Sequence, residues 1–253
     1  MADTKSNKAV LITGGSRGIG RAIAIHAAKA GYDIIFSYRT NLDAATSLYD
    51  ELHALGAKAH GVQADVSTEA GVIRLFQFAD DATGRLDALV NNAGNVAPSS
   101  RVDSFSAARV SDLLALNVLG PILCCREAVK RMSTLYGGRG GNIVNISSIA
   151  ASLGSPGEYV DYAATKAAID TLTKGLAKEV ANEGIRVNAV RPGIIDTDLH
   201  ANSGDRERPF KLQSLIPMQK VGSVDDIAQA VLWLLSDEAS YITGSLLDVS
   251  GGR

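Results

Sequence analysis

The sequence predicts one α/β domain, a doubly wound sheet of seven mainly parallel strands with helices on both faces. Short apolar runs alternate with longer helical patterns along all 253 residues, the order typical of this fold class. Most of the runs are continuously apolar, as in strands that are buried on both faces of a parallel sheet. No shift in composition divides the chain, although its length alone would allow one or two domains. We therefore expect a single domain over residues 1–253.

The predicted strands begin with residues 9–12, which read AVLI and are entirely apolar. Each later run is followed by a stretch of helical pattern or by a polar turn, as expected when helices connect parallel strands. The six later strands are predicted over residues 33–36, 60–62, 86–90, 142–146, 186–190 and 245–249.

Glycine and one capping pattern indicate where helices end and begin. Gly31 and Gly56 follow the first two predicted helices, at a position where glycine is favoured because it adopts left-handed backbone without strain. Ser223 precedes Asp226 by three residues, a pattern similar to a capping box. It predicts the start of the last helix.

The one long irregular segment that the sequence predicts covers residues 196–220, and it is polar and charged. Long loops in compact domains are often lids or binding loops. We expect a substrate lid here, with an exposed insertion of no special role as the alternative.

Composition excludes several classes of function. The 25 basic and 27 acidic residues give a net charge of −2, without the basic excess of a nucleic-acid-binding protein. No apolar run approaches the length of a membrane span, and the polar N-terminus has no secretory signal. Two adjacent cysteines and four histidines show no metal-ligand spacing. We expect a cytoplasmic protein that binds neither nucleic acid, membrane nor metal.

A glycine-rich turn, TGGSRGIG over residues 13–20, directly follows the first strand and opens a helix. Glycine lets the backbone approach a pyrophosphate, and the helix N-terminus offers free N–H groups and partial positive charge. A turn with a purely structural role is the alternative. The position at the start of a strand–helix–strand unit favours a dinucleotide site, with contacts predicted from Gly14, Ser16, Arg17, Gly18, Ile19 and Gly20.

The end of the second strand indicates which dinucleotide binds. An Asp or Glu there usually holds the 2′-hydroxyl of the adenosine ribose, but residues 36–40 read FSYRT and contain no acid. Arg39 lies there instead, and Arg17 lies within the glycine turn. Guanidinium groups suit a 2′-phosphate, so we expect NADP(H), with NAD(H) as the weaker alternative. The alternative is that Arg17 and Arg39 are solvated surface residues that contact no ligand.

Polar and glycine-rich residues also follow the other strands. Because ligands bind outside the carboxyl ends of the strands in an open α/β sheet, we expect these residues to converge on one site. They are Asp65, Val66, Asn92, Ala93, Gly94, Ser148, Pro192 and Gly193.

Tyr162 and Lys166 are four residues apart and therefore share one face of a predicted helix. A free tyrosine has a pKa near 10, but a nearby ammonium and a cationic nicotinamide would lower it and favour proton exchange at neutral pH. Ser148 ends the preceding strand and is placed to hydrogen-bond a substrate oxygen. Two exposed helix residues would be the alternative.

Together these motifs resemble those of the classical short-chain dehydrogenase/reductases over essentially the whole chain. The matching segments are Thr13-Gly14-x-x-x-Gly18-x-Gly20, Asn91-Asn92-Ala93-Gly94, Asn117, Ser148, YAATK over residues 162–166, and Pro192-Gly193. The resemblance implies a Rossmann-type sheet, often a homotetramer, and a catalytic tetrad of Asn117, Ser148, Tyr162 and Lys166.

The resemblance also implies a role for each member of the tetrad. Tyr162 would be the acid/base, Ser148 would hold the substrate oxygen, and Lys166 would lower the pKa of the tyrosine and bind the nicotinamide ribose. Asn117 would position a water in a proton relay. Tyr162 stands 14 residues after Ser148 where many members have 13, which leaves Ser147 as the alternative serine. Besides Tyr162 and Lys166, the positions that usually line the cofactor include Asp65, Asn92, Ile195 and Thr197.

The substrate is less well defined by the sequence. The pattern is also similar to 3-oxoacyl-carrier-protein reductases, which present basic residues to an acidic carrier, but the matching positions here hold Tyr136 and Glu183, with Arg139 nearby. An acid is unfavourable at such a contact. We therefore expect a small-molecule carbonyl or secondary alcohol, with the carrier-bound substrate as the alternative.

A non-catalytic NADP-binding regulator is an alternative of another class, but such members usually lack part of the tetrad. Three residues are candidates for contacts with a polar substrate, each equally well explained as a surface residue: Asn95, Glu158 and His200.

Overall fold

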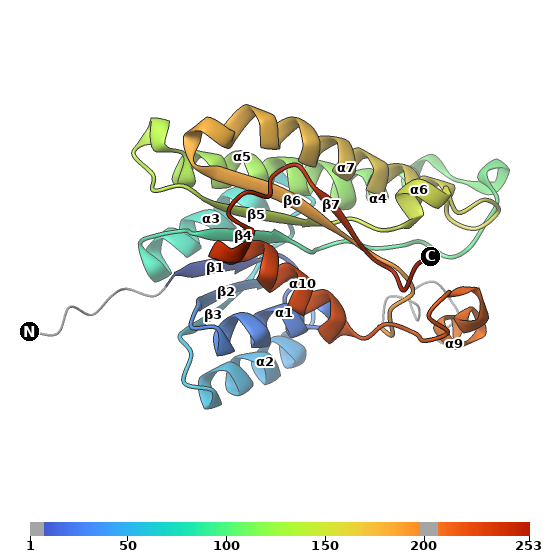
Figure 1. The fold of residues 1–253 in the computed structure, drawn as a ribbon, viewed down its shortest axis with the longest axis horizontal. Coiled ribbons are helices and arrows are strands. Elements are labelled where there is room, and N and C mark those ends of the chain that lie inside the picture. The colour runs from blue at the N-terminus through green and yellow to red at the C-terminus, as the bar shows by residue number, and fades with distance from the viewer. Residues whose placement is uncertain (1–7, 198–206) are drawn as a thin grey trace, which may run out of the picture.

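A seven-stranded sheet in the order β3-β2-β1-β4-β5-β6-β7 forms the centre of the computed structural model, which describes residues 8–197 and 207–253. Every adjacent pair of strands is parallel. The order starts at the centre of the sheet and runs outward in both directions, which is the doubly wound arrangement. The α/β fold expected from the sequence is confirmed (Figure 1).

All seven predicted strands are present, with ends that differ from the predicted ones by at most two residues. The strands are β1 (Ala9–Ile12), β2 (Asp33–Tyr38), β3 (Ala59–Gln63), β4 (Ala88–Asn91), β5 (Gly141–Ile146), β6 (Ile185–Pro192) and β7 (Leu246–Val249).

Helices cover both faces of the sheet. In Figure 1, α1, α2 and α10 lie on one side and α3, α4, α5 and α7 on the other. The helices are α1 (Gly18–Lys29), α2 (Leu42–Ala54), α3 (Glu69–Thr83), α4 (Ala107–Leu114), α5 (Gly120–Met132), α6 (Ala150–Leu153), α7 (Val160–Val180), α9 (Arg208–Lys211) and α10 (Val224–Leu235).

The predicted helix boundaries rest on the expected local chemistry. Gly31 and Gly56 have φ of +85° and +76°, and each stands one residue after a helix C-cap. Both halves of the capping box between Ser223 and Asp226 are formed at the start of α10. These short-range patterns correctly marked where three helices end or begin.

The central strand β1 is continuously apolar because it is buried on both faces of the sheet. In β1, Val10 and Ile12 pack with the residues of α1 and α10, whereas Ala9 and Leu11 pack with those of α3 and α5. All four side chains are completely buried. Since neither face of a central strand meets water, polar groups are placed mainly at the strand ends.

One helical segment, Ala107–Met132, is long and apolar enough to cross a membrane by length and composition alone. The expectation that no segment reaches that length considered only uninterrupted apolar runs. The segment packs against the sheet and α3, and its buried Glu127 carboxylate forms ion pairs with Arg126, Lys130 and Arg131. Such a cluster of charges is costly in a bilayer, so we interpret the segment as a helix that covers the sheet.

The two cysteines lie on the buried side of α5. Cys124 and Cys125 are both free thiols with almost no exposed surface. Burial raises the pKa of Cys125 to about 12 and that of Cys124 further still. The two thiols therefore contribute to the core, as their apolar surroundings require.

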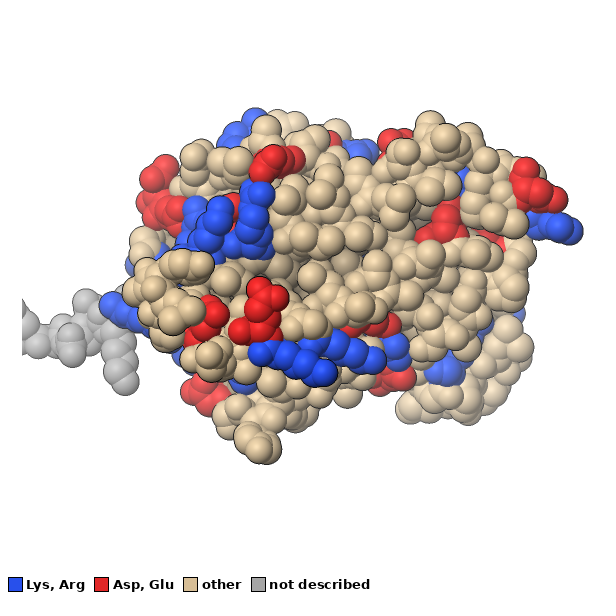
Figure 2. All heavy atoms as spheres, turned by 90° about the horizontal axis from the view of Figure 1, so that it is seen from above, with Lys and Arg blue, Asp and Glu red and all other residues tan. Residues whose placement is uncertain are grey.

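The face at the top of Figure 1, where α7 lies, combines charged groups with large uncharged areas. Basic and acidic side chains lie there in small groups of both signs (Figure 2). Leu114, Leu119 and Ile122 are exposed apolar residues of the 107–132 segment. The homotetramer implied by the family resemblance stays a prediction.

The predicted irregular segment 196–220 is partly regular. Residues 198–206 lie outside the described residues, but Arg208–Lys211 forms α9 and Gln213–Leu215 forms a 3-10 turn. Pro209 stands in the first turn of α9, where its missing N–H costs no hydrogen bond. The expectation of a structureless segment was therefore wrong for its second half, and the lid stays a prediction.

Gly71 connects the packing of α3 to the end of β3. A Cβ atom at Gly71 would lie 2.0 Å from the carbonyl oxygen of Asp65, and Asp65 follows β3. By contrast, Gly175 in α7 is exposed and a Cβ there would meet nothing within 4 Å. A change from glycine to alanine should therefore have opposite effects on the free energy of unfolding at these two helical positions.

We predict that Gly71→Ala lowers the free energy of unfolding by about 1–3 kcal/mol, because the new methyl group forces backbone apart. Gly175→Ala should raise it by about 0.5–1 kcal/mol, because alanine is the better helix former. Urea unfolding of both variants measures the difference. Changes of the same sign in the two variants would contradict the packing described here.

Candidate active site

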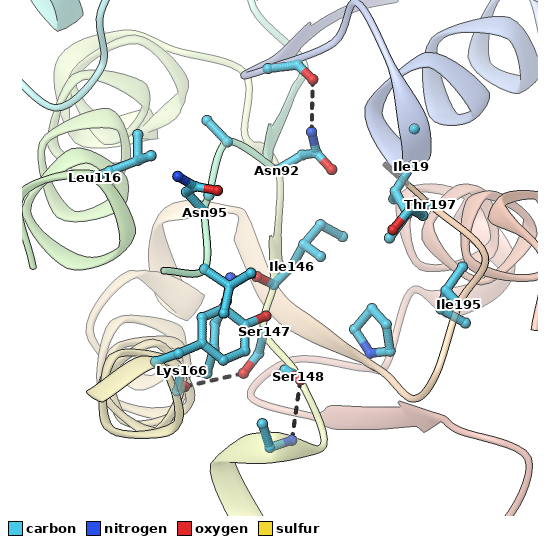
Figure 3. A pocket seen from close by; sticks show the side chains of 18 of the residues that line it. Ile19, Asn92, Asn95, Leu116, Ile146, Ser147, Ser148, Lys166, Ile195 and Thr197 are labelled. Carbon is cyan, nitrogen blue, oxygen red and sulfur yellow. Dashed lines mark hydrogen bonds between the residues drawn. The ribbon is translucent and has the colours of Figure 1, made fainter. Parts of the chain in front are cut away.

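A cleft of about 860 Å³ runs along the carboxyl ends of the strands. It begins at the turn between β1 and α1, passes the ends of β2, β3 and β4, and continues to the ends of β5 and β6 (Figure 3). The strand ends that the sequence predicted to converge therefore do so. Eighteen of the twenty predicted site residues line this cleft, and Gly20 and Asn117 do not.

The turn between β1 and α1 brings backbone unusually close to backbone. Gly14 and Gly18 have φ of +62° and +54°. A Cβ at Gly20 would lie 2.4 Å from the carbonyl oxygen of Gly14 and 2.5 Å from Nδ2 of Asn92. Gly20 therefore acts by close packing under the turn, which explains why it does not line the cleft.

The N-terminus of α1 is free to bind an anion. Its N-cap residue, Arg17, makes no capping hydrogen bond with its side chain, and the first turn contains no acidic residue. The first N–H groups of a helix have no partner within the helix and carry partial positive charge. Together with the glycine backbone, this end of α1 fits the pyrophosphate of a dinucleotide.

Hydrogen bonds fix the end of β4 against the turn. The hydroxyl of Thr13 accepts from the backbone N–H groups of Asn92 and Ala93, both at 3.0 Å. The Asn92 amide in turn donates to the carbonyl oxygens of Thr13 and Gly14, both at 2.9 Å (Figure 3). The two sides of this part of the cleft are therefore held at a fixed separation.

At the end of β2 the cleft contains basic groups. Arg17 and Arg39 both line it, together with Ser37 and Thr40, and no acidic side chain from residues 36–40 is present. Across from them, burial opposes ionisation of Asp65, but hydrogen bonds from Ser67 and the charge of Arg39 hold its pKa below the ordinary value. The charges at this end therefore favour an additional phosphate.

Tyr162 and Ser148 meet at the wall of the cleft beyond β5. Tyr162 keeps part of its surface open to the cleft, but the surrounding protein raises the pKa of its hydroxyl to about 12, against the lowering effect of a hydrogen bond with Ser148. The lowered tyrosine pKa was expected with a cationic nicotinamide beside the phenol, so it stays a prediction for the complex with cofactor. Burial of the phenol outweighs the hydrogen bond with Ser148, because charge is strongly disfavoured when desolvated.

Lys166 is almost fully buried behind Tyr162. Its Nζ donates to the carbonyl oxygen of Ile146 at 2.8 Å and lies 5.6 Å from the centre of the Tyr162 ring. Burial lowers the pKa of Lys166 to about 8, although the charge of Asp170 raises it in part. The ammonium is therefore still largely protonated at neutral pH, next to the tyrosine that would exchange a proton.

Ser147 and Ser148 have different environments and different hydrogen-bond partners. The hydroxyl of Ser147 is buried and donates to the carbonyl oxygen of Lys166 at 3.1 Å. Ser148 is partly exposed, and it is the serine that hydrogen-bonds Tyr162. The geometry favours Ser148 as the serine that faces a substrate, and Ser147 as a residue that holds α7 in place (Figure 3).

Asn117 lies behind the cleft in a π-helical turn, Ala115–Leu119, between α4 and α5. Its side chain accepts from the N–H of Asn95 at 2.9 Å, and donates to the carbonyl of Asn95 at 2.9 Å and to Thr165 at 3.1 Å. It is 1% exposed. Its side chain therefore supports the backbone that follows β4, which explains why it does not line the cleft.

The cleft has further lining residues that the sequence did not single out. Asn95 and Glu158, two candidates for polar contacts, do line it, whereas His200 lies outside the described residues. Val96, Leu116, Ile149, Leu153 and Ile194 add apolar surface to the cleft. Because these residues are far apart in the sequence, no local pattern indicates that they line one cleft. Arg208 also lines the cleft, paired with Glu158 and placed over the ring of Tyr159.

Comparison with known proteins identifies the family of the chain. A family model described as enoyl-(acyl carrier protein) reductase matches residues 14–253. An uncharacterised oxidoreductase of Escherichia coli K12, YgfF, is 53% identical over 243 residues, with 96% of this chain and 98% of the relative covered. The chain belongs to the short-chain dehydrogenase/reductase family.

Two more distant members of the short-chain dehydrogenase/reductases match over nearly their whole length. The 3-oxoacyl-acyl-carrier-protein reductase FabG of Staphylococcus epidermidis is 36% identical, with 97% of this chain and 98% of the relative covered. The structure of a short-chain dehydrogenase from Burkholderia cenocepacia in complex with NADP is 33% identical, with a TM-score of 0.90 and coverage of 98% and 99%. This chain is therefore an oxidoreductase of the family.

We predict that the buried charge of Lys166 makes the stability of this short-chain dehydrogenase/reductase depend on pH. The pKa of Lys166 is about 8 in the folded protein and 10.5 in its ordinary state. At a pH between these two values, the folded protein has released the proton of Lys166, whereas the unfolded chain still binds it. Stability from this group therefore rises with pH across that window. The difference in free energy of unfolding between the wild type and Lys166→Met should grow in favour of the wild type from about pH 7 to about pH 10. A difference that does not change with pH would contradict the burial of the charge.

Proposed function

We propose that the protein interconverts a carbonyl and a secondary alcohol on a small molecule by hydride transfer with NADP(H), with Tyr162 as the acid/base. The observation that carries this proposal is the meeting of Tyr162, Ser148 and Lys166 at one end of a cleft whose other end fits a dinucleotide. NADP(H) would supply or take up the hydride at that point. NAD(H) is the alternative cofactor.

Residues of the chain would hold the cofactor in three places. The N-terminus of α1 and the backbone of Gly14 and Gly18 would bind the pyrophosphate. Arg17 and Arg39 would pair with the 2′-phosphate of NADP(H). The remaining predicted contacts lie further along the cleft: Ser16, Ile19, Asp65, Val66, Asn92, Ala93, Gly94, Lys166, Pro192, Gly193, Ile195 and Thr197. The NADP complex of the Burkholderia cenocepacia relative supports this choice of cofactor.

In the direction of reduction, Tyr162 would donate its proton to the carbonyl oxygen. Its raised pKa keeps the hydroxyl protonated at neutral pH, so the phenol carries the proton that it would donate. The cost of leaving a buried phenolate would be lessened by the ammonium of Lys166. Ser148 would donate a hydrogen bond to the oxygen as charge develops on it. The relay role expected for Asn117 stays a prediction, since its side chain is engaged with Asn95 and Thr165.

The side chains that line the cleft indicate which kind of substrate it suits. Apolar side chains line the cleft together with the paired Glu158 and Arg208. This suits a small ketone or alcohol with an apolar body and a polar group. Reduction of a carrier-bound 3-oxoacyl group is the second candidate, supported by the FabG relative. Retention of all four tetrad residues argues against a non-catalytic regulator.

We predict that the wild type oxidises NADPH in the presence of at least one member of a panel of ketones and 3-oxoacyl thioesters. Tyr162→Phe should lower kcat by about a hundredfold or more, because it removes the proton donor. Tyr159→Phe is the matched control, since Tyr159 is a tyrosine of the same wall without the serine and lysine partners, and its kcat should change little. Loss of absorbance at the NADPH band measures turnover. Equal activity of the wild type and Tyr162→Phe would refute the proposed function.

For the cofactor, we predict that Arg39→Asp raises the KM for NADPH by about tenfold or more, while the KM for NADH changes little, because only NADPH carries the phosphate. Arg74→Asp is the control of equal charge change. Arg74 donates to the carbonyl of Gln63 near β3 but does not line the cleft. Steady-state kinetics with NADPH and with NADH measure both KM values. Equal effects of Arg39→Asp on the two KM values would exclude the pairing of Arg39 with the 2′-phosphate.

A further inference from the structure

Directly behind Tyr162, outside the lining of the cleft, lies a buried ion pair between Arg109 of α4 and Asp161 of α7. The side chains of Arg109 and Asp161 are 14% and 5% exposed. They stand 52 residues apart in the sequence. Asp161 immediately precedes Tyr162, so the pair is attached to the residue proposed as the acid/base.

The pair is bidentate, and it includes the backbone of Tyr162. Arg109 donates from Nε to Oδ2 of Asp161 at 2.7 Å and from Nη2 to Oδ1 at 3.3 Å. The same Oδ1 accepts from the backbone N–H of Tyr162 at 2.9 Å. That N–H belongs to the first turn of α7, where a helix cannot provide a partner of its own. The Asp161 carboxylate therefore satisfies it, in a position that the helix dipole also favours.

The remaining contacts of Arg109 reach the segment that follows β4. Its Nη1 donates to the carbonyl oxygen of Pro98, and its guanidinium lies 4.2 Å from the centre of the Phe105 ring. Pro98 belongs to the segment after β4 that contributes Asn95 and Val96 to the cleft. One guanidinium therefore joins the segment that forms one wall to the helix that carries Tyr162.

We propose that Arg109 and Asp161 are positioning residues that set the place of Tyr162 relative to the wall formed by residues 95–98. The proposal rests on the proposed function, in which Tyr162 transfers the proton. Because each nitrogen of Arg109 has a carboxylate or carbonyl partner and the carboxylate bonds the Tyr162 backbone, the first turn of α7 has little freedom to shift. A displacement of about 1 Å at a reacting group can cost about a hundredfold in rate.

A second ion pair in the chain provides a matched control. Arg131 of α5 donates to Asp80 of α3 at 2.8 and 2.7 Å, and its guanidinium lies over the ring of Phe76. This pair also joins two helices with one arginine, one aspartate and one phenylalanine. Neither Arg131 nor Asp80 lines the cleft. Loss of Arg131 should therefore affect stability without moving Tyr162.

The experiment compares Arg109→Met with Arg131→Met in steady-state kinetics on the best ketone of the panel. We expect Arg109→Met to lower kcat by about tenfold to a hundredfold, with the KM for NADPH within about twofold of the wild type, since the cofactor contacts are untouched. Arg131→Met should retain the kcat of the wild type. Arg109→Lys, which keeps the charge but only one of the hydrogen bonds, should recover part of the loss. An unchanged kcat in Arg109→Met would overturn the proposal.

A second measurement does not require turnover. Hydrogen exchange of the peptide that covers residues 160–166 should be faster in Arg109→Met than in the wild type, and unchanged in Arg131→Met. Equal exchange in all three proteins would overturn the positioning role even if no substrate were found. Retained activity in Tyr162→Phe would instead refute the proposed function and leave the exchange result to decide the role of Arg109. If Arg109→Met does not fold, Asp161→Asn, which has the same size but no charge, serves in both measurements with the same expected direction.

Discussion

Burial of the central strands on both faces is the constraint on which the rest of the structure depends. Successive side chains of β1 point into two different layers of apolar packing, with Val10 and Ile12 on one side and Ala9 and Leu11 on the other. No position within such a strand is left for a polar group that must meet a ligand. Function is therefore confined to the strand ends, and the parallel order brings those ends to a single edge.

Polar groups at that edge are partly removed from water, so each needs a partner within the protein. Thr13 and Asn92 satisfy each other across two strand ends, Asn117 satisfies the backbone of Asn95, and Lys166 donates to a strand carbonyl. These bonds are made before any ligand arrives. The need of these polar groups for hydrogen-bond partners therefore both stabilises the cleft and fixes its arrangement. As a result, few side chains have to move when a ligand binds.

The strands and the glycine turn could be predicted because local patterns determine them: continuous apolar runs, capping residues and glycines at turns. The convergence at the sheet edge followed from the expectation of an open parallel sheet, in which ligands bind at the carboxyl ends of the strands. What depends on packing across the chain could not be predicted. The pKa of Tyr162 is set by the protein around it, and Gly20 and Asn117 support the cleft from behind because of contacts in space. The link from Arg109 to Asp161 spans two helices, and no local pattern in the sequence indicates it.

The two buried thiols of α5 have a consequence for how the protein meets reactive chemicals. Oxidants and alkylating reagents attack the thiolate, and burial keeps Cys124 and Cys125 protonated and covered. Their modification thus requires α5 to separate from the sheet. The rate at which a small alkylating reagent labels them therefore reports how often that layer opens. The same shielding protects these two thiols from peroxide for as long as α5 stays packed on the sheet.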